Sequence, residues 1–266
     1  MQPILIHIPH SSPLIPNELR SQFCVDDDYL RDELLKLTDW FVDDLFNADG
    51  FDSIVFPVSR FVVDVERFAY KAAEPMSSVG MGVIYTNGTD GTPIRNTLKP
   101  QARERLFRCY YCPHHAYLNS WADDALAEYG ACLVIDAHSF RSSPLPCDLD
   151  QEPERPDICV GVDHYHTPPE LERCVVDRFR SFGYTVFVNK PSTGALVPSS
   201  VWKKDSRAWA IMIEINRALY MNEADGMRAA NYDRVKEHVA SVLDACREII
   251  PSPAATKVQA QLTLEF

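Results

Sequence analysis

Residues 132–140 read Cys-Leu-Val-Ile-Asp-Ala-His-Ser-Phe, so an apolar run leads directly to an aspartate and a histidine. Two other stretches follow the same plan: residues 4–8 lead to His10, and residues 209–213 lead to Glu214. Short apolar runs of this kind predict buried strands of an α/β sheet. Ligands of such sheets bind beyond the carboxyl ends of the strands. We therefore expect His10, His138 and Glu214 to meet at one edge, in a site suited to hydrolysis.

The rest of the chain alternates between helical and strand patterns, which predicts a mixed or mostly parallel sheet with helices on both faces. We expect one domain over residues 1–250, followed by a flexible tail over 251–266. A loop rich in glycine, threonine, asparagine and proline is expected over 75–99. Strands are predicted at 3–8, 52–65 (two strands broken near Pro57), 131–136, 158–162, 184–188 and 208–215. Helices are predicted at 26–47, 101–129 (kinked or split at Pro113), 168–181 and 225–248.

The composition limits the classes of partner. The net charge of −12 gives the 266-residue chain no general attraction for nucleic acid or anionic membranes. No stretch approaches the roughly 20 apolar residues of a membrane span, and the N-terminus lacks the pattern of a signal peptide. Eight scattered cysteines predict reduced thiols, and hence a cytoplasmic protein. A protein this acidic needs a local group of arginines to bind an acidic small molecule.

The histidines that follow the first and central strands are the strongest candidates. His10 comes after a strand and a proline that fixes the backbone direction, which favours a ligand role. His7 lies within the strand, so we expect a hydrogen-bonded core histidine. Asp136 and His138 project to the same side of an extended strand. The aspartate either orients a zinc-bound imidazole or forms a purely structural hydrogen bond with it, and the motif alone leaves both interpretations open.

A carboxylate within an apolar strand is costly unless it is paired or lies near a metal, and this points to Glu214. Loss of solvent raises the pKa of such a carboxyl toward the range of a general base. The alternative for Glu214 is an ion pair with Arg217. Together with Arg60 and Arg67, Arg217 offers guanidinium groups that fit carboxylates. The alternative for these arginines is pairing with acids of the protein itself.

Other signals are less informative. Cys109 and Cys112 have the spacing of metal ligands, but no second cysteine pair completes a zinc finger, and a packed helix explains them equally well. The glycines at 80 and 82 lack the strand-turn-helix context of a nucleotide loop. Asp39 borders the apolar face of the predicted helix at 26–47, and the pattern alone does not single it out.

Six short motifs together resemble the N-formylglutamate amidohydrolase (N-formylglutamate deformylase) family, over about residues 4–245. This family is related in fold to zinc carboxypeptidases and aspartoacylase. The resemblance implies a single-domain three-layer αβα sandwich of the zinc-exopeptidase or phosphorylase/hydrolase type. The motifs are His-Ile-Pro-His-Ser-Ser at 7–12, Thr-Asp-Trp at 38–40, Ser-Arg-Phe-Val-Val-Asp-Val-Glu-Arg at 59–67, Gly-Met-Gly-Val-Ile-Tyr at 80–85, Asp-Ala-His-Ser at 136–139 and Glu-Ile-Asn-Arg at 214–217.

The same resemblance implies a catalytic zinc, or another divalent metal, held by His10, Asp39 and His138. Two histidines, a carboxylate and an open position make up a catalytic zinc set. Glu214 takes the place of the general base of the wider zinc carboxypeptidase group. Asp64 and Asp136 are expected to contact the ligand side chains without binding the metal themselves. The expected substrate contacts are Arg60, Arg67, Tyr85, Asn216 and Arg217.

The implied reaction is hydrolysis of N-formyl-L-glutamate to formate and L-glutamate, a step in histidine breakdown. Many family members carry asparagine where this chain has Glu66. This change puts a negative charge where a substrate carboxylate is expected, so one alternative is an amidase for another N-acyl amino acid or peptide. A second alternative is a binding protein that keeps the fold and has lost turnover. The partner is a small molecule in each case.

Overall fold

The computed structural model describes residues 3–70 and 73–251, so nearly all of the expected tail lies outside the described residues. Within these ranges six strands form one sheet in the order β2-β1-β3-β6-β4-β5. Neighbouring strands are parallel except for β4 and β6, which are antiparallel. The strands are β1 (Ile4–Ile8), β2 (Asp52–Val55), β3 (Cys132–Phe140), β4 (Ile158–Gly161), β5 (Val186–Val188) and β6 (Ala208–Asn216). The predicted mixed, mostly parallel sheet is confirmed.

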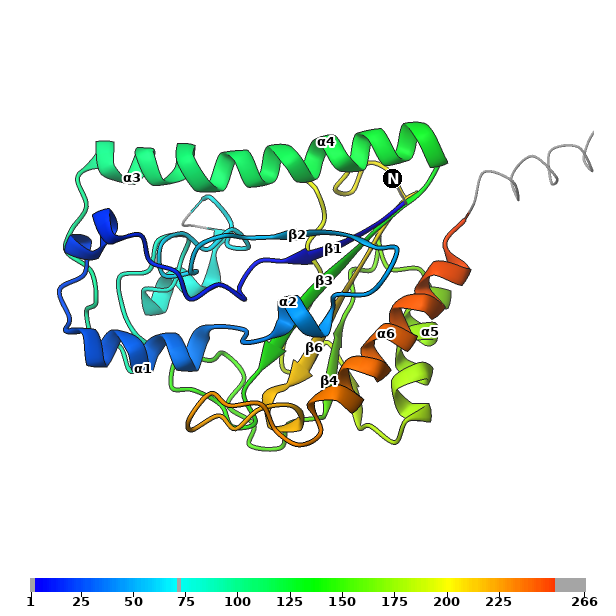
Figure 1. Ribbon diagram of the computed structural model, residues 1–266. Coiled ribbons are helices and arrows are strands. Elements are labelled where there is room, and N and C mark those ends of the chain that lie inside the picture. Colours follow the sequence, from blue (N-terminus) through cyan, green and yellow to red (C-terminus); the bar gives the residue numbers. More distant parts are fainter. Residues whose placement is uncertain (1–2, 71–72, 252–266) are drawn as a thin grey trace, which may run out of the picture.

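Helices cover both faces of this sheet and complete the predicted α/β fold (Figure 1). α3 and α4 run as one long rod along one face, joined by a π-helical turn at Phe107–Tyr111. Pro113 lies in the first turn of α4, directly after this π-helical turn, and the rod continues through it. The helices are α1 (Asp27–Leu37), α2 (Val42–Leu45), α3 (Pro100–Leu106), α4 (Cys112–Tyr129), α5 (Pro169–Ser181) and α6 (Tyr232–Ile249).

The two faces of the sheet bury different side chains, because successive strand residues point to opposite sides. One face is apolar along the whole length of its strands and packs against α2, α5 and α6, through residues such as Ile6, Ile135, Ile213, Val239 and Leu243. The other face is apolar only near the amino ends of the strands, where it meets α4, through Leu5, Val134, Leu118 and Trp121. Farther along, this second face carries polar side chains.

Two of the strands extend beyond their predicted ends. β3 runs to Phe140 rather than 136, and β6 runs to Asn216. His138 therefore lies inside β3 instead of following it, and it is the direct neighbour of Glu214 in the β3–β6 register. Since neighbours in register project to the same face, the longer strands bring the two side chains together.

The prediction of a second strand within 52–65 is wrong. Only β2 forms there, and the segment after Pro57 folds into turns. Its apolar side chains are buried although it joins no sheet: Phe61, Val62 and Val63 are at most 1 % exposed. Turn hydrogen bonds satisfy part of the backbone, including one from the Val62 N–H to the Ser59 carbonyl. The apolar run after Pro57 therefore predicts burial correctly, although the segment does not form a strand.

The single helix predicted over 26–47 is also wrong, because α1 ends at Leu37 and α2 begins only at Val42. Phe41 has a φ of 65°, a left-handed conformation that interrupts a right-handed helix. The Asp39 N–H donates to the carbonyl of His10 at 2.9 Å instead of to a helical carbonyl. Asp39 therefore lies in a break between helices, beside the turn that follows β1. The last helix likewise begins later than predicted, at Tyr232.

All eight cysteines are free thiols, and Cys109 and Cys112 are exposed. Neither belongs to a group of side chains placed to hold a metal among the described residues. Both lie in the helical rod, Cys109 in its π-helical turn and Cys112 at the start of α4. Across the described part of the chain, no helix combines the length and the apolar character that a membrane crossing requires.

Candidate active site

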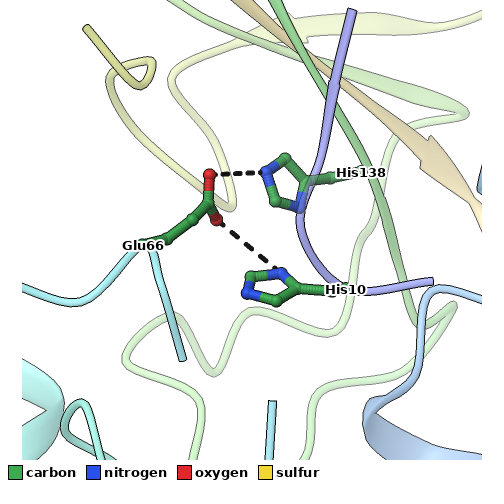
Figure 2. A group of neighbouring side chains, drawn as sticks. All are labelled: His10, Glu66 and His138. Carbon is green, nitrogen blue, oxygen red and sulfur yellow. Dashed lines mark hydrogen bonds and ion pairs between the residues drawn. The ribbon is translucent and has the colours of Figure 1, made fainter. Parts of the chain in front are cut away.

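Three side chains from distant parts of the sequence converge beyond β1 and along β3 (Figure 2). His10 follows β1, His138 lies on β3, and Glu66 comes from the turns that follow β2. The Glu66 Oε1 atom is 3.1 Å from His138 Nε2, and its Oε2 atom is 3.7 Å from His10 Nδ1. One donor atom from each residue lies within 4.8 Å of the other two, so the three could hold a metal ion.

His10 has one ring nitrogen engaged and one free. Its Nε2 lies 2.9 Å from Asp64 Oδ1, and a carboxylate can only accept, so Nε2 carries the hydrogen. Buried Nδ1 has no hydrogen-bond partner and faces Asp39 Oδ2 at 3.8 Å and Glu66 Oε2 at 3.7 Å. Burial and the charge of Arg60 lower the pKa of His10, which keeps a lone pair on Nδ1. An imidazole oriented by a carboxylate, with a buried free nitrogen, fits a metal ligand.

His138 lies between carboxylates on both sides of its ring. Its Nδ1 is 3.1 Å from Asp39 Oδ2, and its Nε2 is 3.1 Å from both Glu66 Oε1 and Asp136 Oδ1. Burial disfavours the charged ring, yet Glu66 and Asp136 raise the pKa of His138 well above its usual value. The site therefore favours positive charge at this point, whether as a proton or as a metal ion.

Asp39 lies beside both predicted histidine ligands, although the sequence pattern does not select it. Its Oδ1 accepts a hydrogen bond of 2.8 Å from Arg217 Nη2, which leaves Oδ2 facing the imidazoles. Burial alone would raise the pKa of Asp39, but the hydrogen bond from His138 and the charge of Arg217 lower it below its usual range. Asp39 thus bridges Arg217 and His138. Asp64 bridges Arg60 and His10 in the same way.

A chain of hydrogen bonds connects the site to α4. His7 Nδ1 lies 2.8 Å from Asp136 Oδ1, and His7 Nε2 lies 2.8 Å from His114 Nε2 on α4. The prediction that His7 is a hydrogen-bonded core histidine is confirmed. His7, Glu66 and Asp136 also form a second group whose donor atoms could hold a metal. Nothing in the sequence singles out His114, and the structure places it at the buried end of this chain.

Glu214 is buried on β6, next to His138 on the neighbouring strand. Burial raises the pKa of Glu214, and this effect outweighs the opposing charge of His138. The alternative ion pair with Arg217 is not formed, because that guanidinium pairs with Asp39 at 2.8 Å. A buried carboxylate with a raised pKa beside candidate metal ligands has the properties of a general base.

The three candidate arginines differ in how many of their donors are free. Arg60 donates from Nε and Nη2 to Asp64 Oδ2. Arg217 bonds Asp39, and its Nε donates to Ser139 Oγ at 3.0 Å. Arg67 lies 3.4 Å from Asp64 Oδ2, but its buried Nε makes no hydrogen bond. Arg67 is therefore the arginine with most capacity left for a ligand.

The remaining predicted substrate contacts, Tyr85 and Asn216, are both engaged within the protein. The Tyr85 hydroxyl donates to Asp64 Oδ2 at 2.7 Å and accepts from the Arg60 side chain. The Asn216 amide donates to the Pro156 carbonyl and accepts from the backbone of the next helical turn. These contacts hold the surrounding loops in place, and a direct role toward a substrate stays a prediction.

Glu66 is the residue that sequence reasoning placed differently. The sequence predicts Glu66 opposite a carboxylate of the substrate, whereas in the structure its carboxylate faces His10 and His138. One signal was present in the sequence: Asp64 and Glu66 are two acids, two residues apart, that follow an apolar run. Burial of such a run draws the acids that follow it into the interior, where each needs a partner.

Comparisons with known proteins agree on a family. A family model described as N-formylglutamate amidohydrolase matches residues 2–221. N-formylglutamate deformylase of Pseudomonas aeruginosa is 25% identical over 83% of both chains, and that of Pseudomonas putida is 24% identical over 84% of this chain and 83% of the other. The crystal structure of N-formylglutamate amidohydrolase from Ralstonia eutropha JMP134 aligns over 94% of both chains, with 24% identity and a TM-score of 0.81. The chain belongs to the N-formylglutamate amidohydrolase family.

Proposed function

We propose that the protein is a metal-dependent amidohydrolase that converts N-formyl-L-glutamate to formate and L-glutamate. The observation that carries the proposal is the free, buried Nδ1 of His10, which faces carboxylates and lies near a second histidine. The names of the two Pseudomonas relatives support the substrate. We assign the reaction to histidine breakdown in the cytoplasm, a setting that suits eight free thiols.

The donor set fits zinc or another divalent ion. Imidazole nitrogens and carboxylate oxygens are the donors of catalytic zinc sites, and we propose that His10, Asp39 and His138 hold the ion. When bound, it supplies Lewis-acid chemistry that polarises a carbonyl oxygen and favours ionisation of water. Asp64 orients His10 through its Nε2–H, and Asp136 lies against Nε2 of His138.

Glu214 is the proton carrier in this proposal. Its carboxylate takes a proton from the attacking water and delivers it to the amide nitrogen as the C–N bond breaks. The new amine then leaves as L-glutamate, and the oxygen of the water remains in formate. The raised pKa of Glu214 strengthens it as a base, provided that it is ionised at the working pH.

Substrate carboxylates need positive charge in a protein whose net charge is −12. Arg67 is the first choice because its Nε has no hydrogen bond and its side chain is 24% exposed. Arg60 and Arg217 are more deeply buried and donate hydrogen bonds to Asp64 and Asp39, whereas the ion pair of Arg67 with Asp64 includes no hydrogen bond from Nε. We propose that these two hold the site in shape while Arg67 contacts the substrate.

Formate release by metal-depleted and reconstituted protein tests the proposal. N-formyl-L-glutamate, N-formyl-L-aspartate and N-acetyl-L-glutamate form the substrate panel, with zinc, cobalt and manganese as the metals. We expect formate from N-formyl-L-glutamate only with metal present. Release of another acyl group alone identifies an amidase of different specificity. Substrate binding with no turnover under any metal identifies a binding protein.

A further inference from the structure

We propose that Glu66 is itself a ligand of the metal ion when no substrate is bound, an inference that rests on the proposed metal dependence. The first observation is the surroundings of its carboxylate. In the described residues all its ion-pair partners are imidazoles: His138 at 3.1 Å, and His7 and His10 at 3.7 Å each. Within residues 3–70 and 73–251, no arginine or lysine forms an ion pair with Glu66, whereas Asp39 pairs with Arg217.

The second observation is the free nitrogen of His10. Nδ1 is buried, its residue is 2% exposed, and it lacks a hydrogen bond. Glu66 Oε2 and Asp39 Oδ2 approach it at 3.7 and 3.8 Å, too far for hydrogen bonds. Donors bound to one tetrahedral zinc ion, with bonds of about 2.0–2.1 Å, lie roughly 3.3 Å apart. Donor atoms of Glu66, His10 and His138 lie within 4.8 Å of one another, and neither such group among the described residues includes Asp39, so a contraction around an ion brings Glu66 into its coordination shell.

The third observation is the charge balance of the site. Five carboxylates surround the histidines, and three guanidinium groups accompany them. With all five carboxylates ionised and the imidazoles neutral, as they are when they bind a metal ion, two negative charges remain uncompensated. One divalent ion supplies the missing charge. The carboxylates are those of Asp39, Asp64, Glu66, Asp136 and Glu214, and the guanidinium groups are those of Arg60, Arg67 and Arg217.

The backbone holds Glu66 in this position. Its N–H donates to Asp64 Oδ1 at 3.1 Å. The carbonyls on either side of it are fixed to the long helical rod: His115 Nε2 donates to Val65 at 2.8 Å, and the Tyr111 hydroxyl donates to Arg67 at 2.9 Å. These contacts fix the backbone of Glu66, so its carboxylate is held toward the histidines as a metal ligand would be.

Glu66 also differs from the other candidate ligands in exposure. Its side chain is 16% exposed, whereas those of His10 and Asp39 are 2% exposed. It is therefore the ligand that a molecule entering from solvent meets first.

The test compares the wild type with Glu66→Gln, which keeps the shape and removes the charge. Glu237→Gln, at an exposed position of α6, is the matched control. Zinc affinity is measured by competition with a chelator, the ligand field by the visible spectrum of the cobalt form, and the geometry by a crystal structure of zinc-loaded wild type. We expect a Glu66 oxygen within about 2.2 Å of zinc. Glu66→Gln should weaken zinc binding at least about ten-fold and alter the cobalt spectrum, and the control should do neither.

The readouts separate this inference from the proposed function. Zinc bound by His10 and His138, with both Glu66 oxygens beyond about 3 Å and an unchanged cobalt spectrum in Glu66→Gln, overturns the inference alone. The inference is also overturned if Glu66→Gln lowers the zinc affinity but leaves the cobalt spectrum unchanged. That result reports only a lost hydrogen bond to His138. Failure of the wild type to bind any divalent ion overturns both proposals.

Discussion

The two faces of the central sheet are built from the same strands and reach stability by different means. The face against α5 and α6 is apolar throughout, so burial of area stabilises it without directional contacts. The face against α4 becomes polar toward the carboxyl ends of β1, β3 and β6, where His7, Asp136, His138 and Glu214 are buried. Burial of polar groups is tolerated only when they are paired. The polar face therefore gains less free energy from burial than the apolar face does, and its pairing contacts fix the positions of its titratable side chains.

The largest expected effect is on the polar face and concerns activity. Glu214→Gln removes the proposed base while keeping its shape, and we expect kcat for formate release to fall by roughly 10²–10⁴. The free energy of unfolding should hardly change, since a neutral amide is easier to bury than a carboxylate. Activity within two-fold of the Glu237→Gln control would show that another group carries the proton.

The second prediction concerns the apolar face. Leu243 on α6 is fully buried, and we expect Leu243→Ala to lower the free energy of unfolding by about 3 kcal/mol through lost burial and a cavity. The kcat of the folded fraction should match that of the wild type. Urea denaturation provides the measurement, and Leu149→Ala, at a position 68% exposed, is the control. Loss of kcat in the folded fraction would mean that the two faces are not separable.

A smaller effect on stability is expected where the polar face meets α4. His114→Leu leaves His7 Nε2 without its partner, at a cost of about 1–2 kcal/mol. Burial lowers the pKa of His114 from 6.5 to about 2, so the folded protein holds it neutral and unfolding lets it take up a proton in mild acid. Wild-type stability should therefore fall by about 1 kcal/mol from His114 alone between about pH 7.5 and 5.5.

Comparison of urea denaturation at the two pH values isolates this contribution. The wild type should lose more stability in acid than His114→Leu, because the variant has no proton to take up at this position. An equal loss in the wild type and in His114→Leu would contradict a neutral His114 in the folded state.

The smallest effect is expected outside the sheet, where α2 meets α6. Asp44 accepts hydrogen bonds of 2.6 Å from Lys236 Nζ and from the Tyr232 hydroxyl, and these lower its pKa. A lowered pKa stabilises the fold above the usual pKa of aspartate, and this contribution disappears as the pH falls through the folded value. Since the side chain is 34% exposed, Asp44→Asn should cost only about 0.5–1 kcal/mol at neutral pH.

Thermal melting of Asp44→Asn at neutral and acidic pH provides the measurement. The difference from the wild type should shrink in acid, where both side chains are neutral. Asp43→Asn, at the exposed neighbouring position, is the control. A difference that grows in acid would reverse the sign of the linkage.

The sequence predicted those parts of the fold that follow from the periodicity of single strands. Alternation along β3 placed Asp136 and His138 on one face, and the cost of a buried acid identified Glu214 as unusual. Asp39 could not be placed in this way, because its position depends on the left-handed Phe41 and on a hydrogen bond to His10. These are tertiary contacts, and they override the helical pattern on either side of them.

Glu66 illustrates the same limit from another side. Its segment has the composition of a strand, yet it folds into turns, so strand parity carries no information about where the side chain points. Its position follows from partners on the α3–α4 rod, such as Tyr111 and His115, which are distant in sequence. Periodicity along a single element does not report such contacts.

The pairing of Asp39 with Arg217 and His138 has a consequence for assembly. These residues come from the first, last and middle parts of the folded chain, and Asp39 also bonds the backbone of His10. A partly folded chain that lacks β6 has no Arg217 to hold Asp39, so it does not possess the cation site. An ion then binds only the fully folded chain. Because it binds the native state alone, its binding free energy adds to the stability of that state. In the proposed metalloenzyme, the ion would therefore stabilise only a chain in which these three parts have come together.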